Sequence, residues 1–532
     1  MVQSNPVFNI QRALKRSGLL ASAEEKLLPI LAGKTSENNV DSRNLETDVQ
    51  KLLESLDWKH DRQKIARFTV ELMPFEELVP KVYEAWRPVV SEALYHVAEK
   101  LPPQRLIPKL VQEITHPDQP LEQRFIRFIT AMPTLQKLGQ VIARNRNLDP
   151  HFRNQLIQLE NSIRNVSSKD IHKAIKLSLA KQLKTYNVKI ADIIHSEASV
   201  SAVTRFTWTN PASGLEENGV FKVQKPGIAA LFRSEMRLLS GLAQHLKEKT
   251  ANHILEEVDI ETTFSDIRTH LESELDSKRE QTNLLFAQKR LKMSPHVRIP
   301  TLIEELSTPT ITAMSFEEGK KVTEAYPKNT SRRNELAARI FETLVAIPLY
   351  SSEAQAIFHA DPHAGNLLVN ESTHELVIVD WSLTEKLSLS ERRKLVMLVS
   401  ALFLRDEHLI FHVINELRIE NDTYSDECME TIYRIIQEYL ESLPIIHLPK
   451  LKQILTLLDD VAAAGLQFSS GFLIFRKVLL TLDGVLRDLS DQVPVESIIA
   501  HFAFKEWIRH TWGLTIEELI DKPTNLSASE SF

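Results

Sequence analysis

Cysteine, glycine and long apolar runs are scarce in this sequence, and each scarcity excludes a class of protein. The one cysteine, Cys428, excludes an intrachain disulfide or a cysteine-rich metal site, which is compatible with a reducing cytoplasm. The 13 glycines among 532 residues argue against a barrel or a loop-rich sheet protein. The most apolar window, Leu395 to Leu404, is shorter than the roughly 18 residues of a membrane span, so we expect a core helix there. The N-terminus shows no signal-peptide pattern, and we expect none.

An excess of positive charge is also missing. The net charge of −7 gives no general case for nucleic-acid binding. Hydrophobic residues make up 43% and charged residues 25% of the chain, which is typical of a soluble globular protein. At about 150 residues per domain, the length allows two or three domains. Apolar residues at helical spacing, such as Leu336, Ile340 and Leu344, predict a mainly helical chain.

A few stretches depart from the helical pattern. Val203 to Trp208 and Gly219 to Lys225 are predicted strands, and helices are predicted to resume through Thr262 to Leu291. The polar stretch Lys34 to Asn44 is the best candidate for a linker. The segment before it reads as a basic amphipathic helix. Such a helix can lie on an anionic membrane, but we favour docking against the protein itself.

The most informative motif contains three residues suited to binding ATP and magnesium. Asp361 is followed five residues later by Asn366, and a short apolar strand ends in Asp380. In a kinase-like fold the first carboxylate lies where a phosphoryl acceptor would be, and the amide and the second carboxylate can hold Mg²⁺ against the phosphates. Magnesium prefers such oxygen ligands.

The surrounding sequence predicts a strand, a turn and a return strand. Leu367 to Val369 is apolar, Asn370 to Glu375 is polar, and Leu376 to Val379 is apolar again. In the alternative interpretation, His359 and Asp361 form a capping pair and Asp380 is only a turn residue.

Lys222 lies at the centre of an alternating strand and is the candidate for the lysine that pairs with the α- and β-phosphates. The alternative is a solvent-facing lysine on an edge strand. A kinase lysine also needs a carboxylate partner on a helix, and composition alone does not choose among the acidic residues of the helix Asp266 to Leu291. The candidates are Glu272, Glu274, Asp276 and Glu280.

Taken in order, these motifs resemble the UbiB/ADCK family of atypical kinases, also called AarF. The resemblance extends from about Met132 to Asp488. The matching segments are Lys137-Leu138-Gly139-Gln140 for KxGQ, Ala198 to Val203 for the alanine-rich loop, Val220 to Gly227 for VAVKVQRPG, Glu274-Leu275-Asp276 for ExD, and His359 to Asn366 for HxDPHPGN, with Ala364 replacing a proline.

The resemblance implies a role for each matched residue. Lys222 would pair with Glu280 and contact the phosphates, Asp361 would be the catalytic-loop aspartate, and Asn366 and Asp380 would bind Mg²⁺. Further nucleotide-site positions are implied for Ala198, Ser199, Lys137, Gln140, Glu274 and Asp276. The helical extension that carries Lys137 and Gln140 would occupy the space that a protein substrate needs.

The implied fold is α+β: a bilobal, protein-kinase-like fold that is predominantly helical and has a helical N-terminal extension. Met314 to Glu317 would form the hinge, and the backbone near Glu317 would meet the adenine. We expect five regions: a helical N-terminal region at 1–115, a KxGQ-containing extension at 116–185, a small lobe at 186–316, a large lobe with C-terminal helices at 317–520, and a tail at 521–532.

Two positions depart from the family pattern. Asp380-Trp381-Ser382 replaces Asp-Phe-Gly, and the lost glycine is expected to stiffen the loop. Glu197 would bring a carboxylate near the phosphates. Both changes bear more on turnover than on nucleotide binding.

The function implied is that of an atypical kinase or ATPase that uses ATP and Mg²⁺ and supports ubiquinone biosynthesis or lipid homeostasis. Its expected partners are ATP or ADP, isoprenoid lipid or a membrane surface, and enzymes of quinone biosynthesis, with no nucleic acid. We expect a cytoplasmic location with peripheral membrane contact. The alternatives are a small-molecule phosphotransferase of the aminoglycoside- or choline-kinase type, a nucleotide-binding pseudokinase scaffold, and a plain helical interaction protein.

Overall fold

The computed structural model describes residues 6–19, 42–142, 150–152, 156, 166–197, 200–249, 260–292, 294–327, 329–418, 425–443, 451–468, 470–490, 497–499 and 501–502. The chain forms two compact units. Unit 1 consists of Met1–Glu216 and Phe221–Leu275, and unit 2 of Glu217–Val220 and Asp276–Phe532. The five regions expected from the sequence are a finer division, which stays a prediction.

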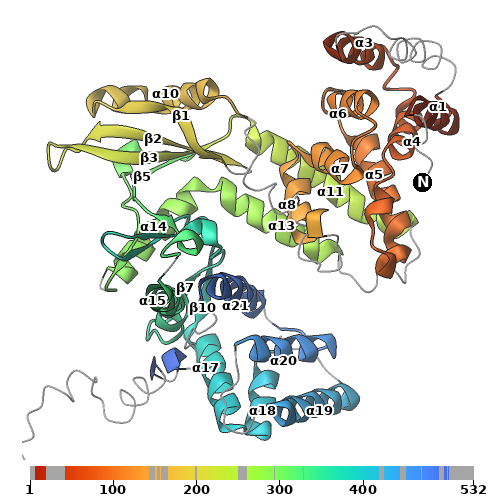
Figure 1. Ribbon diagram of the computed structural model, residues 1–532. Coiled ribbons are helices and arrows are strands. Elements are labelled where there is room, and N and C mark those ends of the chain that lie inside the picture. Colours follow the sequence, from red (N-terminus) through yellow and green to blue (C-terminus); the bar gives the residue numbers. More distant parts are fainter. Residues whose placement is uncertain are drawn as a thin grey trace, which may run out of the picture. The chain divides into compact units, whose positions relative to one another are not determined.

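Unit 1 is mainly a helical assembly (Figure 1). Its N-terminal helix has Ile10 and Leu14 buried in the core of the unit, so the amphipathic segment docks on its own protein, as favoured. The helices are α1 (Pro6–Ser17), α3 (Ser42–Glu54), α4 (Arg62–Leu72), α5 (Arg87–Lys100), α6 (Pro103–Thr115), α7 (Leu121–Ile129), α8 (Pro133–Ile142), α10 (Ser168–Thr185), α11 (Ile228–Lys249) and α13 (Ile260–Leu275).

Long basic side chains satisfy the carbonyl groups left over at helix C-termini in unit 1. Arg62 donates to the carbonyls of Glu99 and Leu101 at the end of α5. Lys109 donates to the carbonyls of Phe128 and Thr130 at the end of α7. Such carbonyls have no partner within the helix, and a cation there also suits the helix dipole. Burial lowers the pKa of Lys109 to about 8, helped by the nearby positive charge of Arg105.

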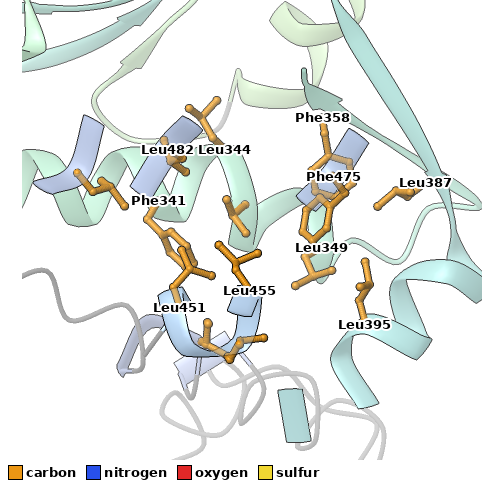
Figure 2. Packing of buried hydrophobic residues seen from close by; sticks show 14 of the residues in the cluster. Phe341, Leu344, Leu349, Phe358, Leu387, Leu395, Leu451, Leu455, Phe475 and Leu482 are labelled. Carbon is orange, nitrogen blue, oxygen red and sulfur yellow. The ribbon is translucent and has the colours of Figure 1, made fainter. Parts of the chain in front are cut away.

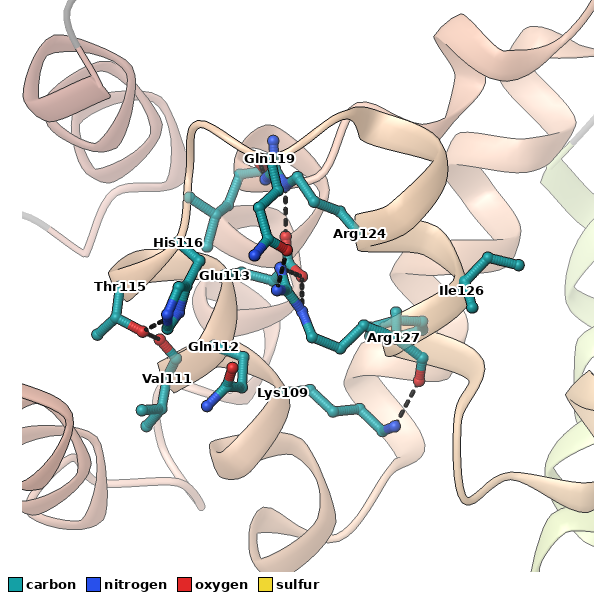
Figure 3. A network of polar contacts seen from close by, with 12 residues as sticks. Lys109, Val111, Gln112, Glu113, Thr115, His116, Gln119, Arg124, Ile126 and Arg127 are labelled. Carbon is teal, nitrogen blue, oxygen red and sulfur yellow. Dashed lines mark hydrogen bonds and ion pairs between the residues drawn. The ribbon is translucent and has the colours of Figure 1, made fainter. Parts of the chain in front are cut away.

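A buried carboxylate with two arginine partners joins α6 to α7 (Figure 3). Glu113 is 1% exposed, and its Oε2 lies 2.6 Å from Arg124 Nε. Its Oε1 lies 2.9 Å from Arg127 Nη2. Arg124 also donates to the Leu72 carbonyl, which brings α4 into the same network. Both oxygens of this carboxylate are therefore occupied by internal partners.

The first sheet has the strand order β1-β2-β3-β5. Its strands are β1 (Lys189–Glu197), β2 (Ser201–Thr209), β3 (Glu216–Gln224) and β5 (Ile311–Ser315), and β3 has residues in both units. The strands predicted around Val203 and Gly219 are confirmed as β2 and β3. The strand β1, which was not predicted, pairs antiparallel with β2 and packs against α10 (Figure 1). Its isoleucines, at 190, 193 and 194, follow neither the alternation of a strand nor the spacing of a helix.

The helices predicted through Thr262 to Leu291 are confirmed, but the single helix predicted from Asp266 to Leu291 is wrong, because the chain breaks at Asp276. The helix α13 ends at Leu275, and α14 (Ser277–Leu291) starts directly after the break. The Asp276 carboxylate accepts the N–H of Arg279 at 3.0 Å. A side chain that caps a new helix in this way competes with continuation of the preceding one.

Unit 2 has a large apolar core between its helices and two small sheets, with Phe341, Phe358 and Phe475 among its members (Figure 2). The predicted core helix around Leu395 to Leu404 is confirmed as α17. The remaining helices are α15 (Thr330–Phe341), α16 (Ile347–Leu349), α17 (Leu389–Leu404), α18 (Glu407–Glu416), α19 (Asp426–Ser442), α20 (Leu451–Ala463) and α21 (Ser470–Leu489), with a π-helical segment at Glu342–Ala346.

The two sheets of unit 2 position the segment that contains the candidate residues Asp361, Asn366 and Asp380. One pairs β7 (Gln355–His359) with β10 (Thr384–Ser388) in antiparallel fashion. The other has the order β4-β9-β8-β6. Its strands are β4 (Val297–Arg298), β6 (Lys320–Lys321), β8 (Leu367–Asn370) and β9 (Glu375–Ile378). Among the described residues of the whole chain, no helix combines the length and the apolar character needed to cross a membrane.

Candidate active site

The register of one hairpin brings Asn366 and Asp380 together. Leu367 of β8 pairs with Ile378 of β9, and just beyond this pair the Val379 N–H donates to the Asn366 carbonyl at 2.9 Å. The two candidate metal ligands therefore leave the open end of the hairpin side by side. This arrangement follows directly from the strand, turn and return strand that the sequence predicts.

His359 links this hairpin to the loop that carries Asp361. Its ring is 2% exposed, with Nε2 lying 3.3 Å from the Val379 carbonyl and Nδ1 accepting the Asp361 N–H at 3.3 Å. A ring that donates from Nε2 and accepts at Nδ1 is the neutral tautomer. Burial lowers the pKa of His359, against smaller opposing effects of the Val379 carbonyl and of Asp361 and Asp380. The neutral ring can therefore make both contacts at once, and we call this connection the His359 tether. A simple capping pair of His359 and Asp361 would not include the contact with Val379, which follows β9.

The loop between Asp361 and Asn366 is closed by its own hydrogen bonds. The Asp361 carbonyl accepts the Asn366 side-chain amide at 3.1 Å and the His363 N–H at 2.9 Å. Because the amide nitrogen of Asn366 is used here, the amide oxygen is the atom suited to a metal. His363, which the sequence analysis left without a role, has Nε2 3.8 Å from Asp361 Oδ2 and accepts the Gly365 N–H.

Asp380 has an unusual backbone conformation that the following serine supports. Its φ is 58°, in the left-handed region that aspartate tolerates better than most residues do. The Ser382 hydroxyl donates to Asp380 Oδ1 at 2.6 Å, and the Ser382 N–H donates to the same oxygen at 3.2 Å. The residue with positive φ is therefore Asp380 and not Ser382, which stands where the family pattern has glycine. Ser382 instead contributes a hydrogen bond that glycine could not.

Two further contacts hold this turn in place. The Trp381 indole donates to the Ile378 carbonyl at 3.2 Å, and Asn283 of α14 donates to the Trp381 carbonyl at 3.0 Å. The rings of His359 and Trp381 meet edge to face, with their centroids 5.0 Å apart. The position of the Asp380 carboxylate is therefore set by packing as well as by hydrogen bonds.

Of the four candidate carboxylate partners of Lys222, Glu272 and Glu274 lie on α13, and Asp276 and Glu280 lie at the start of α14. Glu280 is 4% exposed and accepts the Thr312 hydroxyl of β5 at 3.1 Å. Asp276 caps the helix in which Glu280 lies. Lys222 lies on β3 between the buried residues Phe221 and Val223. Its pairing with Glu280 stays a prediction.

The KxGQ and ExD segments meet within unit 1. Lys137 Nζ of α8 lies 3.1 Å from Glu274 Oε1 of α13, and both side chains are at least 85% buried. The start of α8 is held by the buried Glu235 of α11, which accepts the Thr134 N–H at 3.0 Å and the Thr134 hydroxyl. Nothing in the spacing of the sequence indicates Glu235 as the capping partner of this helix.

The remaining predicted positions have mixed outcomes. The Glu317 side chain is 8% exposed and is held by Arg298 at 2.6 Å and by the Ser315 hydroxyl at 2.6 Å. Because this side chain is already engaged, only the backbone is left for adenine, and that contact stays a prediction. Ala198 and Ser199 lie outside the described residues, and the side chains of Gln140 and Glu197 are not among those described.

Comparisons with known proteins agree with the motifs. Residues 158–414 match the ABC1 atypical kinase-like domain. A probable protein kinase UbiB of Photobacterium profundum is 24% identical over 417 residues, covering 75% of this chain and 72% of the relative. The corresponding protein of Pasteurella multocida is 22% identical over 427 residues, covering 74% and 78%. A Mycobacterium tuberculosis protein solved in complex with erythromycin is 16% identical, with a TM-score of 0.44 over 63% of this chain and 82% of that chain.

The domain match and the relatives show that the chain has a kinase-like α+β fold, of the class found in atypical kinases. The match and the relatives confirm the resemblance to the UbiB/ADCK family that the motifs predicted.

Proposed function

We propose that this protein binds ATP with Mg²⁺ and transfers the γ-phosphoryl group, either to water or to a small-molecule acceptor. The observation that carries the proposal is the hydrogen-bonded set in unit 2 that joins Asp361, Asn366 and Asp380 through His359 and Val379. Phosphoryl transfer depends mainly on positioning and on electrostatic stabilisation. A rigid set of oxygens at one end of a hairpin meets the first of these needs.

Each residue has a separate role in this proposal. Asp361, whose carboxylate is about a quarter exposed, would orient the attacking hydroxyl or water. Asn366 and Asp380 supply an amide oxygen and a carboxylate, which are donors of the kind that Mg²⁺ takes from proteins. The bound ion would neutralise charge on the phosphates. Lys222, with Glu280 as its partner, would hold the α- and β-phosphates.

The segment around Lys137 would restrain the nucleotide and exclude protein substrates. Its ion pair with Glu274 supports this role, because it fixes the KxGQ helix to the helix that carries the ExD motif. Lys137→His should then change nucleotide preference or permit autophosphorylation without unfolding the protein. Unaltered affinity and activity in that variant would retire this part of the proposal.

The acceptor chemistry we favour is that of isoprenoid quinone biosynthesis, on the strength of the family resemblance. ATP hydrolysis should therefore be measured with and without anionic liposomes and a phenolic mimic of a quinone precursor. Stimulation by either addition would support a role at membrane lipids. Binding of nucleotide with no hydrolysis under any of these conditions would favour a pseudokinase scaffold.

The direct test of the proposal is ligand-dependent stability. A ligand at a hundred times its dissociation constant adds about 2.7 kcal/mol to the free energy of unfolding. Mg²⁺-ADP should therefore raise the melting temperature of the wild type, and Asp380→Asn should remove most of the shift. Asp460→Asn, at an exposed position of α20, is the matched control and should behave as wild type. An unchanged melting temperature of the wild type at millimolar nucleotide would contradict the proposal.

A further inference from the structure

A cavity in unit 1 has the chemistry of an anion-binding site. It has a volume of about 300 Å³ and lies among α5, α6 and α11. Three basic side chains line it, Lys100, Arg105 and Arg237, and no acidic residue is among its described lining residues. This cavity is not formed by any motif of the proposed nucleotide site.

The strongest indication of a ligand is His96, which lines the cavity from α5. The residue is 4% exposed, and neither of its buried ring nitrogens has a hydrogen-bond partner of good geometry, although the Leu238 backbone lies close enough to the ring to raise its pKa. Buried polar atoms in folded proteins are rarely left unpaired, so each exception asks for a reason such as a bound water or ligand. Burial lowers the pKa of His96, and the nearby His245 and Lys100 lower it further. The Leu238 backbone and the Glu99 carboxylate have the opposite effect and raise it. A neutral ring of this kind still has one N–H to donate.

The backbone of α11 leaves room for this ring. A Cβ atom on Gly241 would lie 3.2 Å from His96 Nε2, closer than most side-chain contacts allow. Glycine in the middle of a helix is unfavourable, and here it permits the close approach of the histidine. The cavity therefore depends on a position where any other residue would crowd the ring.

The charges around the cavity are only partly balanced. Lys100 pairs with Glu99 at 3.1 Å, and Arg105 pairs with the buried Glu235. Among the described residues, Arg237 has no acidic partner within ion-pair distance, and this exposed side chain is one of those that line the cavity. A guanidinium group presents paired N–H donors that match the oxygens of a phosphate. The remaining lining is apolar on one side, from Leu101, Pro102 and Leu238.

We propose that this cavity, which we call the α5–α11 pocket (His96, Lys100, Arg105, Arg237 and Gly241), binds a phosphomonoester. Arg237 and Lys100 hold the phosphate, and His96 donates a hydrogen bond to it. The volume exceeds that of a bare phosphate, so the apolar lining residues contact a small organic group. The phosphate belongs either to a soluble metabolite or to a lipid headgroup, and the two sources are separated by experiment.

The test uses the full-length chain and two probes. Binding of glycerol phosphate is measured by calorimetry at constant ionic strength, and binding to phosphatidylcholine vesicles is measured with and without phosphatidic acid. Arg237→Gln should weaken binding about tenfold or more, because a charge-assisted hydrogen bond is lost. Arg233→Gln, an exposed arginine of the same helix outside the cavity lining, is the matched control and should leave binding unchanged.

Each outcome decides the proposal. Glycerol phosphate binding that depends on Arg237 supports it with a soluble ligand, and phosphatidic acid binding that depends on Arg237 supports it with a lipid. Binding that Arg237→Gln leaves intact but Asp380→Asn abolishes belongs to the nucleotide site and overturns it, as does the absence of binding to both probes. His96→Phe, which keeps the ring volume, should also weaken binding. Unchanged binding in that variant would show that His96 is only a packing residue and would overturn its assigned role.

Discussion

Units 1 and 2 each contain carboxylates held in place by nearby groups, but the oxygens of these carboxylates serve different ends. In unit 1 both oxygens of Glu113 are taken by arginines, and the side chain is 1% exposed. In unit 2 the Asp361 carboxylate is 27% exposed, and the one side chain described within ion-pair distance of it is His363, whose Nε2 lies 3.8 Å from Oδ2. Because both oxygens of Glu113 are paired, this carboxylate connects structural elements. Asp361 is held by hydrogen bonds of its backbone, so its carboxylate oxygens stay available for chemistry.

The buried ion pair should give the largest effect on stability. Glu113→Ala leaves Arg124 and Arg127 without their carboxylate in the interior, and breaking a buried pair in this way typically costs about 3–5 kcal/mol. Urea unfolding measures the loss. Glu84→Ala, which removes a surface pair of the same unit with a carboxylate side chain 68% exposed, should cost less than about 1 kcal/mol. An equal loss of unfolding free energy in the two variants would show that the buried ion pair stabilises the protein no more than the exposed one.

The opposite behaviour is expected at Asp361. Asp361→Asn should reduce ATP turnover by about 10²- to 10⁴-fold, the usual contribution of a positioned acid or base, while leaving the free energy of unfolding nearly unchanged. Nucleotide binding should be retained, because the proposed metal ligands are untouched. Single-turnover hydrolysis and thermal shift separate the two quantities. Wild-type turnover in this variant would rule out the role given to Asp361.

The tether formed by His359 should make unit 2 sensitive to acid. The folded-state pKa of this histidine lies below its ordinary value of 6.5, so on acidification the unfolded chain takes up the proton first. The stabilisation is present above pH 6.5 and is lost as the pH falls below it, with a slope of up to about 1.4 kcal/mol per pH unit. His359→Gln should lose less stability than wild type between about pH 7 and about pH 5.5. Identical pH profiles would mean that another group controls acid unfolding.

The smallest effect is expected at Ser382. Ser382→Gly removes the hydroxyl that donates to Asp380, and such a bond is worth about 0.5–1.5 kcal/mol, or roughly a tenfold change in Mg²⁺-nucleotide affinity at most. Because positive φ falls on Asp380 and not on Ser382, the added glycine brings no conformational benefit. If hydrolysis were absent in wild type and present only in this variant, the pseudokinase scaffold would be the better description.

Local spacing determined the part of the site that lies on one hairpin. Asn366 and Asp380 flank strands joined by a short polar turn, and antiparallel pairing of those strands leaves little choice of where their ends meet. The strands β2 and β3 and the core helix α17 were predictable for the same reason, since each has a clear period of apolar residues. The family motifs, which occur in the expected order along the chain, further predicted which of these residues belong to one site.

Only the tertiary structure decided which distant groups support the site. Glu280 receives its hydrogen bond from a threonine 32 residues away, and the helix that carries Lys137 is capped by a glutamate 101 residues from Thr134. The burial of Glu317 by Arg298 and the break at Asp276 were likewise not predicted. Sequence periodicity predicts which face of a helix or strand is apolar. It does not predict which distant polar group will be the hydrogen-bond partner of a buried oxygen. That choice is made when water is excluded and every buried polar group must find another partner.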